Sequence, residues 1–183
     1  MTGRTTMLAW MRPSFQTDLA QLKAGVRHVV RSELADGKDS LSKLRAWARR
    51  MGLFAAVDRD GFFTLSCSPS AARRALHIDR LPGRHETALG QVLGYPLCCC
   101  RAAARQSEAC IDEWALSISK RRFIGLYRLI HPGGYSDGQA ILSHVPCSPR
   151  CRPSLQMALT LLAGASRPWL CSSYRGTARV VRR

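Results

Sequence analysis

The sequence predicts an α+β protein that is predominantly α-helical and has one small β-hairpin. Two observations lead to this prediction. Apolar residues recur at helical spacing along most of the 183-residue chain, and one pair of β-rich runs flanks a glycine-containing turn. The length fits one compact domain, which can bury an apolar core without disulfide bonds or metal. The eight cysteines of the chain therefore need a separate explanation.

The first two helices are expected between residues 14 and 52. Ser14 can cap a helix in which apolar residues recur at helical spacing as far as Val30. The next helix is expected to begin at the capping residue Ser40 and to end at Gly52, since glycine commonly follows the last helical turn.

The hairpin is expected at residues 53–58 and 61–66, where β-rich runs flank Arg59 and Asp60. The order helix, helix, hairpin also resembles part of a winged-helix DNA-binding domain. The second helix carries the basic residues that such a domain needs for phosphates, namely Lys43, Arg45, Arg49 and Arg50. A charged face on an amphipathic helix is more often its solvated side, and we prefer that interpretation.

The rest of the chain is expected to be mainly helical. Ser68 followed by Pro69 favours a helix start, and Pro96 can open a later helix. Residues 123–130 are ambiguous between helix and strand. The expected helical segments, in order, are residues 71–76, 85–94, 96–120 and 153–163.

Four regions follow from these elements, and we expect them to form one compact domain overall. They are a flexible leader at 1–13, a helix-helix-hairpin region at 14–83, a helical region with a Cys/His metal site at 84–170, and a basic tail at 171–183. The apolar run near the start is too short for a secretory signal, and no run approaches the ~20 apolar residues that span a bilayer. We therefore expect a cytoplasmic protein that does not enter membranes.

Two clusters hold five of the eight cysteines, Cys98–Cys100 and the pair Cys147 and Cys151. In a reducing compartment, clustered cysteines are more often metal ligands or redox groups than disulfides. The first cluster follows Pro96 at a helix start, where free N–H groups and the helix dipole favour thiolates. The second lies with His144 in a loop held by two prolines. Cys67, Cys110 and Cys171 stand alone and are expected to pack as small apolar residues.

We therefore predict one metal centre that is built from both clusters. Its expected cofactor ligands are Cys98, Cys99, Cys147 and Cys151, with His144 as a fifth candidate ligand or as a neighbour of the ligands. The sequence alone leaves the role of Cys100 undecided.

The same residues carry a resemblance to a known family. The chain contains Gly94-Tyr95-Pro96-x-Cys98-Cys99 and, about fifty residues later, Ser143-His144-x-Pro146-Cys147-Ser148-x-x-Cys151. In both elements it resembles the domain-of-unknown-function 483 family, over roughly residues 88–162. The resemblance implies a site at the four cysteines and His144 but implies no reaction, and Cys100 lies outside the pattern.

The kind of metal depends on how the ligands converge. Four thiolates suit either tetrahedral zinc or an iron–sulfur cluster. Adjacent Cys98 and Cys99 project about 100° apart in a helix, so both are expected to reach a single ion only where the backbone is irregular. A larger cluster tolerates this divergence better. We therefore expect an iron–sulfur cluster or another iron site in preference to zinc, with a metal-free redox pair or buried structural cysteines as further alternatives.

The charge of the chain indicates its partners. Lys and Arg number 28 against 12 Asp and Glu, a formal charge of +16, and no acidic residue follows Asp137.

Signature motifs of P-loop, dinucleotide-binding, zincin and α/β-hydrolase proteins are absent from the sequence. We expect redox or metal-assisted chemistry on an anionic substrate or with an acidic partner protein. The protein is then an enzyme if its metal keeps an open coordination position.

Two other classes of function stay open at this point. A zinc-stabilised nucleic-acid-binding module would use exposed arginines for phosphate contacts. An accessory subunit would dock to another enzyme through the basic surface and perform no chemistry of its own.

Overall fold

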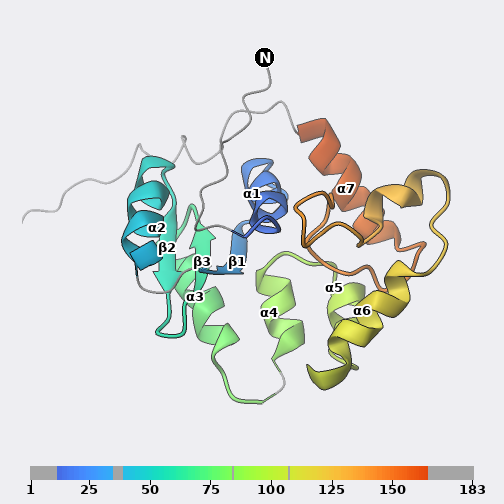
Figure 1. The fold of residues 1–183 in the computed structure, drawn as a ribbon, viewed down its shortest axis with the longest axis horizontal. Coiled ribbons are helices and arrows are strands. Elements are labelled where there is room, and N and C mark those ends of the chain that lie inside the picture. The colour runs from blue at the N-terminus through green and yellow to red at the C-terminus, as the bar shows by residue number, and fades with distance from the viewer. Residues whose placement is uncertain (1–11, 35–38, 84, 107, 165–183) are drawn as a thin grey trace, which may run out of the picture.

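A three-stranded antiparallel sheet forms the centre of the N-terminal half, with strand order β1-β3-β2 (Figure 1). The computed structural model describes residues 12–34, 39–83, 85–106 and 108–164. The strands are β1 (Val29–Glu33), β2 (Phe54–Val57) and β3 (Phe62–Ser66). The expected hairpin is confirmed as β2 and β3, which pair with Phe54 opposite Ser66.

The first predicted helix is shorter than expected. Helix α1 (Phe15–Lys23) ends before Gly25, whose φ of 70° lies in the left-handed region that glycine adopts without strain. Val29 and Val30 belong to β1 instead of this helix, because β-branched side chains suit an extended backbone and both valines are buried against neighbouring elements. The sheet therefore has one strand more than predicted.

Helix α2 (Asp39–Arg50) lies between β1 and β2 in the chain. It begins one residue before the expected cap at Ser40, and Gly52 follows it with a φ of 71°. A helix-turn-helix unit joins two helices by a turn of three or four residues. Here β1 separates α1 from α2, so these two helices do not form the pair that the winged-helix comparison requires.

The C-terminal half is built from short helices and loops. Its elements are α3 (Pro69–Asp79), α4 (Glu86–Val92), α5 (Leu97–Ala103), η1 (Glu108–Cys110), α6 (Ile111–Ser119), η2 (Gly125–Ile130) and α7 (Arg152–Gly164). Ser68 caps α3 by accepting a hydrogen bond from the Ala71 N–H, as its sequence predicts. The ambiguous segment at 123–130 contains the 3₁₀ helix η2.

The helix expected over 96–120 is wrong as one continuous element. It is divided into α5 and α6, with the 3₁₀ turn η1 before α6. Beyond the end of α5, the Gln106 side chain donates to the carbonyl of Ala102. In a continuing helix, the Ala102 carbonyl would accept a hydrogen bond from a backbone N–H. Here it accepts one from a side chain instead.

The two larger apolar cores lie on either side of α1, and a smaller cluster of Val29, Ala75 and Leu93 is separate from both. The first core packs α1 and α2 on the sheet, with Phe15, Leu44 and Phe63 at its centre. The second core gathers α6, η2 and α7 and includes the sulfur-bearing side chains of Cys99 and Cys151. Figure 1 shows α1 between the sheet and α7.

The fold class is confirmed as α+β, dominated by helices with a small antiparallel sheet. Most of the expected leader and all of the expected basic tail lie outside the described residues. Across the described ranges, the helices are all too short or too polar to cross a membrane.

Candidate metal centre

Four cysteine sulfurs from two distant segments meet at one point. The Sγ atoms of Cys98, Cys99, Cys147 and Cys151 all lie within 4.8 Å of one another. The Sγ of Cys151 is 3.7 Å from that of Cys98 and 3.6 Å from that of Cys99. The structure therefore brings together the four cysteines that the sequence groups into one site.

The start of α5 supplies the first two sulfurs. Pro96 precedes the helix with extended backbone angles, and its carbonyl accepts hydrogen bonds from the N–H groups of Cys99 and Cys100. The helix is regular here, and the Sγ atoms of Cys98 and Cys99 are 3.9 Å apart. The expectation that these neighbours need an irregular backbone to reach one ion is wrong, because rotation about each Cα–Cβ bond offsets the divergence of the two Cβ directions.

The loop before α7 supplies the other two sulfurs. The Cys147 N–H donates to the Sγ of Cys99 at 3.4 Å, which fixes the loop against α5. The Cys151 N–H donates to the carbonyl of Ser148, and the Leu155 N–H donates to the carbonyl of Cys151. The chain between the two cysteines is thus a tight turn that ends at Cys151, directly before α7.

Exposure differs among the four cysteines. Cys99 and Cys151 are buried, Cys147 is half-buried and Cys98 is exposed. An ion entering the centre therefore approaches from the side of Cys98.

The hydrogen bonds among the sulfurs shift their protonation. The hydrogen bond that the Cys99 thiol donates lowers the pKa of Cys151 to about 4. Hydrogen bonds from Ser154 act in the same direction with smaller effect, and burial opposes both. The same Cys99–Cys151 bond and burial raise the pKa of the Cys99 thiol. Burial, and then the neighbouring Cys151, raise the pKa of Cys147 to about 11. A divalent ion that binds all four thiolates must displace the remaining thiol protons.

His144 lies beside this centre but outside the group of four sulfurs. Its Nε2 is 2.9 Å from Ser154 Oγ, and that hydroxyl donates to the Sγ of Cys151 at 3.2 Å. Burial, and then the charge of Arg27, lower the pKa of His144 to about 3, so the ring is neutral at physiological pH. Its Nδ1 has no hydrogen-bond partner among the residues that the structure describes. His144 is therefore connected to the sulfurs indirectly, through the Ser154 hydroxyl.

Arg27 connects both halves of the site and was not identified from the sequence. Its Nε donates to the carbonyl of Leu93 at 2.6 Å, directly before the Gly94-Tyr95-Pro96 element. Its Nη1 donates to Ser143, directly before His144. The same Nη1 forms a buried ion pair with Asp18 of α1 at 2.6 Å. One buried side chain thus fixes the two cysteine-bearing segments to the N-terminal half.

Asp18 completes this connection. Burial raises its pKa, while Arg27, Ser143 and Tyr135 act in the opposite direction. The Tyr135 hydroxyl donates to the second carboxylate oxygen at 3.2 Å. Every oxygen of the carboxylate therefore has a donor, as a buried charge requires.

Tyr95 and Gly94 adapt the first element to Arg27. The Tyr95 ring lies 4.6 Å from the Arg27 guanidinium carbon and 5.1 Å from the His144 ring. The Tyr95 hydroxyl donates to the carbonyl of Ser143. Gly94 has a φ of 81°, and a Cβ there would lie 3.5 Å from the Arg27 Cγ. These contacts explain the glycine and the tyrosine of the Gly-Tyr-Pro element by their packing against Arg27 and its neighbours.

The other cysteines have different surroundings. Cys100 is buried and donates to the carbonyl of Tyr95, and its Sγ lies against Gly90 of α4, outside the group of four. Cys110 is exposed at the start of α6, so its expected packing as a small apolar residue is wrong. Cys67 packs against the first core but is disulfide-bonded, so the expectation that it serves only as a small apolar residue is wrong. Cys171 lies outside the described residues.

Comparison with known proteins identifies no family model, curated protein or solved structure that matches the chain. The resemblance to the domain-of-unknown-function 483 family therefore stays a prediction.

Proposed function

We propose that the protein binds one metal ion through the thiolates of Cys98, Cys99, Cys147 and Cys151, which we call the four-cysteine centre. The spacing of the sulfurs carries this proposal. A zinc–thiolate bond is about 2.3 Å long, so two sulfurs on a tetrahedral zinc ion lie about 3.8 Å apart. The three sulfur–sulfur distances among Cys98, Cys99 and Cys151, from 3.6 to 3.9 Å, agree with that value, and the sulfur of Cys147 lies within 4.8 Å of each of them.

This spacing favours a single ion over an iron–sulfur cluster. In a cluster, several iron and sulfide ions lie between the cysteines and separate at least some of their sulfurs more widely. The sequence-based preference for a cluster depended on the divergence of Cys98 and Cys99, and their 3.9 Å separation removes that argument. We therefore propose zinc as the occupant, with a single iron ion of similar bond length as the alternative.

The ligand set indicates what the ion does. Four thiolates fill all positions of a tetrahedral ion, whereas catalytic zinc sites keep one position for water or substrate. The four-cysteine centre joins α5 to the start of α7 across about fifty residues of chain. We propose that it is a structural centre that fixes these segments, in place of the metal-assisted chemistry that the sequence suggested.

The charge of the filled centre fits the basic composition. One divalent ion with four thiolates carries two negative charges, which buried or half-buried surroundings must balance. Exposed arginines stand next to the cysteines in the chain, namely Arg101, Arg150 and Arg152. The expected acidic or nucleic-acid partner and the cytoplasmic location stay predictions.

Metal analysis of the full chain, purified anaerobically without added metal, tests the proposal. We expect one zinc ion per chain and, after exchange with cobalt, the intense visible bands of a tetrahedral thiolate site. Cys147→Ser should lose the metal, whereas the exposed Cys110→Ser should retain it. An iron–sulfur absorption spectrum, or a wild-type protein without stoichiometric metal, would overturn the proposal.

A further inference from the structure

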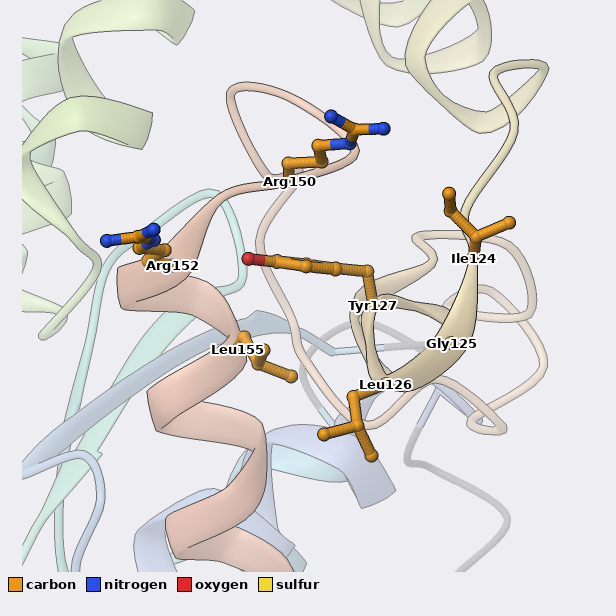
Figure 2. A pocket seen from close by; sticks show the side chains of 7 residues that line it. All are labelled: Ile124, Gly125, Leu126, Tyr127, Arg150, Arg152 and Leu155. Atoms are coloured by element: carbon orange, nitrogen blue, oxygen red, sulfur yellow. The ribbon is translucent and has the colours of Figure 1, made fainter.

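A surface pocket lies beside the four-cysteine centre, between η2 and the start of α7 (Figure 2). It is shallow and widely open to solvent, with a volume of about 580 Å³. Its principal lining residues are Ile124, Leu126, Tyr127, Arg150, Arg152 and Leu155.

One part of the pocket is apolar and open to solvent. Leu126 is 63% exposed and Ile124 is 42% exposed, so two large apolar side chains are left uncovered. Figure 2 shows the Tyr127 ring extending from η2 toward α7, with Leu155 below it. An aromatic ring with aliphatic neighbours offers a surface on which a flat apolar group can stack.

The other part of the pocket is positively charged. Arg150 and Arg152 are exposed, and neither forms an ion pair within the described part of the chain. The lining contains no acidic residue. Both guanidinium groups point away from the Tyr127 ring in Figure 2, and each stands on a flexible aliphatic stem.

We propose that this pocket binds a small amphipathic anion, a carboxylate or phosphate attached to an apolar group. The apolar group packs on Tyr127 and Leu155, and the anion pairs with Arg150 and Arg152. Guanidinium groups suit both anions because each can donate two parallel hydrogen bonds. The positive pair and the uncovered apolar side chains then have one common occupant.

The inference rests in part on the proposed function. Arg150 lies in the turn between Cys147 and Cys151, so a metal bound by these cysteines holds the arginine at the edge of the pocket. Removal of the metal should weaken ligand binding because this turn loses its anchors. Substitution of Arg150 should weaken ligand binding while the metal content stays unchanged.

Protein NMR titration of the full, metal-loaded chain tests the pocket with four probes. Phenyl phosphate and phenylacetate carry both features, inorganic phosphate carries only the charge, and benzyl alcohol carries only the ring. We expect at least one of the two amphipathic probes to bind about tenfold more tightly than either single-feature probe, with shifts at Tyr127 and Leu155. Stronger binding of one of them identifies the preferred anion.

Three variants complete the test. Arg150→Gln combined with Arg152→Gln should weaken the binding of that probe about tenfold, and Leu126→Ser should weaken it severalfold. Arg73→Gln, which removes an exposed arginine of α3, is the matched control and should bind as the wild type does. Equal affinity in the double variant and the control, or equal affinity for benzyl alcohol, overturns the inference. Arginine-dependent binding by a chain that carries no metal would retain the pocket and refute the four-cysteine centre.

Discussion

The two larger cores of the protein are held together in different ways. The first core consists of apolar side chains between helices and the sheet, such as Phe15, Leu44 and Phe63. The second core contains Cys99 and Cys151, and its elements are linked by sulfurs and hydrogen bonds from side chains. The comparison teaches that apolar packing forms the first core, whereas the second core adds contacts between cysteine sulfurs and their polar neighbours.

The amount of regular structure explains this difference. Between the end of α6 and the start of α7, the 3₁₀ helix η2 is the one helix, and no strand occurs in this described stretch. Irregular chain is costly to order because it gains few backbone hydrogen bonds for the conformational entropy that it loses. Side-chain links such as the hydrogen bonds of Cys99, Ser154 and Cys151 offset that cost, and the proposed metal ion is expected to add to them.

Metal removal should have the largest effect on stability, and it should destabilise the second core without destabilising the first. Binding of structural zinc contributes about 10–16 kcal/mol in small zinc-folded peptides, which exceeds the total stability of many domains. We expect chelation, or Cys99→Ser, to abolish hydrogen-exchange protection in α5, η2 and α7. The strands should stay protected. Equal loss of protection in both halves would contradict the comparison.

Loss of Arg27 should have the next largest effect, because this residue joins the two halves. Arg27→Met leaves the Asp18 carboxylate buried without its charge partner, which typically costs about 3–5 kcal/mol. Urea unfolding should show this loss together with weaker metal affinity, since Leu93 and Ser143 lose their anchor. Arg27→Met with Asp18→Asn should recover part of the stability. No recovery would indicate that the ion pair itself is not the source of the effect.

A cavity in the first core should act on the N-terminal half alone. Leu65 is fully buried in β3, and Leu65→Ala should cost about 3 kcal/mol by removing apolar contacts and leaving a void. The zinc content and the cobalt spectrum should not change, because no ligand lies in that core. Metal loss in this variant would show that the two halves do not respond separately.

The sequence predicted the elements better than the contacts between them. Helical spacing located α2, α4 and α7 because each buries one face, and turn residues located the hairpin. Val29 and Val30 were assigned to a helix, since their spacing fits both a helix and a strand until the partner strand is known. The four cysteines that meet at one point were predicted together because they cluster along the chain even though the two segments are far apart.

The Asp18–Arg27 pair could not be found in the same way. Charged residues are mostly exposed, and nothing in the spacing of these two indicates that both are almost fully buried. Their burial depends on how α1 packs against the loop that carries Ser143, which is a tertiary contact between residues more than a hundred positions apart. Patterns along the chain do not specify such contacts.

Gly90→Ala tests the packing of the helix pair that presents the cysteines. A Cβ at Gly90 would lie 2.6 Å from the Sγ of Cys100, closer than atoms approach without moving. We expect a loss of about 1–3 kcal/mol in unfolding free energy, typical of overpacking. Gly90→Ala with Cys100→Ala should recover part of this loss in a double-mutant cycle, and metal binding should persist because Cys100 is not a ligand. Additive effects of the two substitutions would contradict direct contact.

The smallest expected effect is a dependence on pH that comes from His144. Its folded pKa of about 3 lies below the ordinary value of 6.5, so the folded protein favours the neutral ring. The stabilisation is therefore complete above pH 6.5 and is lost as the pH falls toward 3, by about 1.4 kcal/mol per pH unit below 6.5. Wild type should lose about 1.4 kcal/mol between pH 8 and 5.5 through this residue.

His144→Gln should lack that part of the change, while the exposed His77→Gln should retain it. Since both variants keep all four cysteines, a pH-dependent loss of metal affects them alike, and the difference between their urea unfolding curves isolates the buried imidazole.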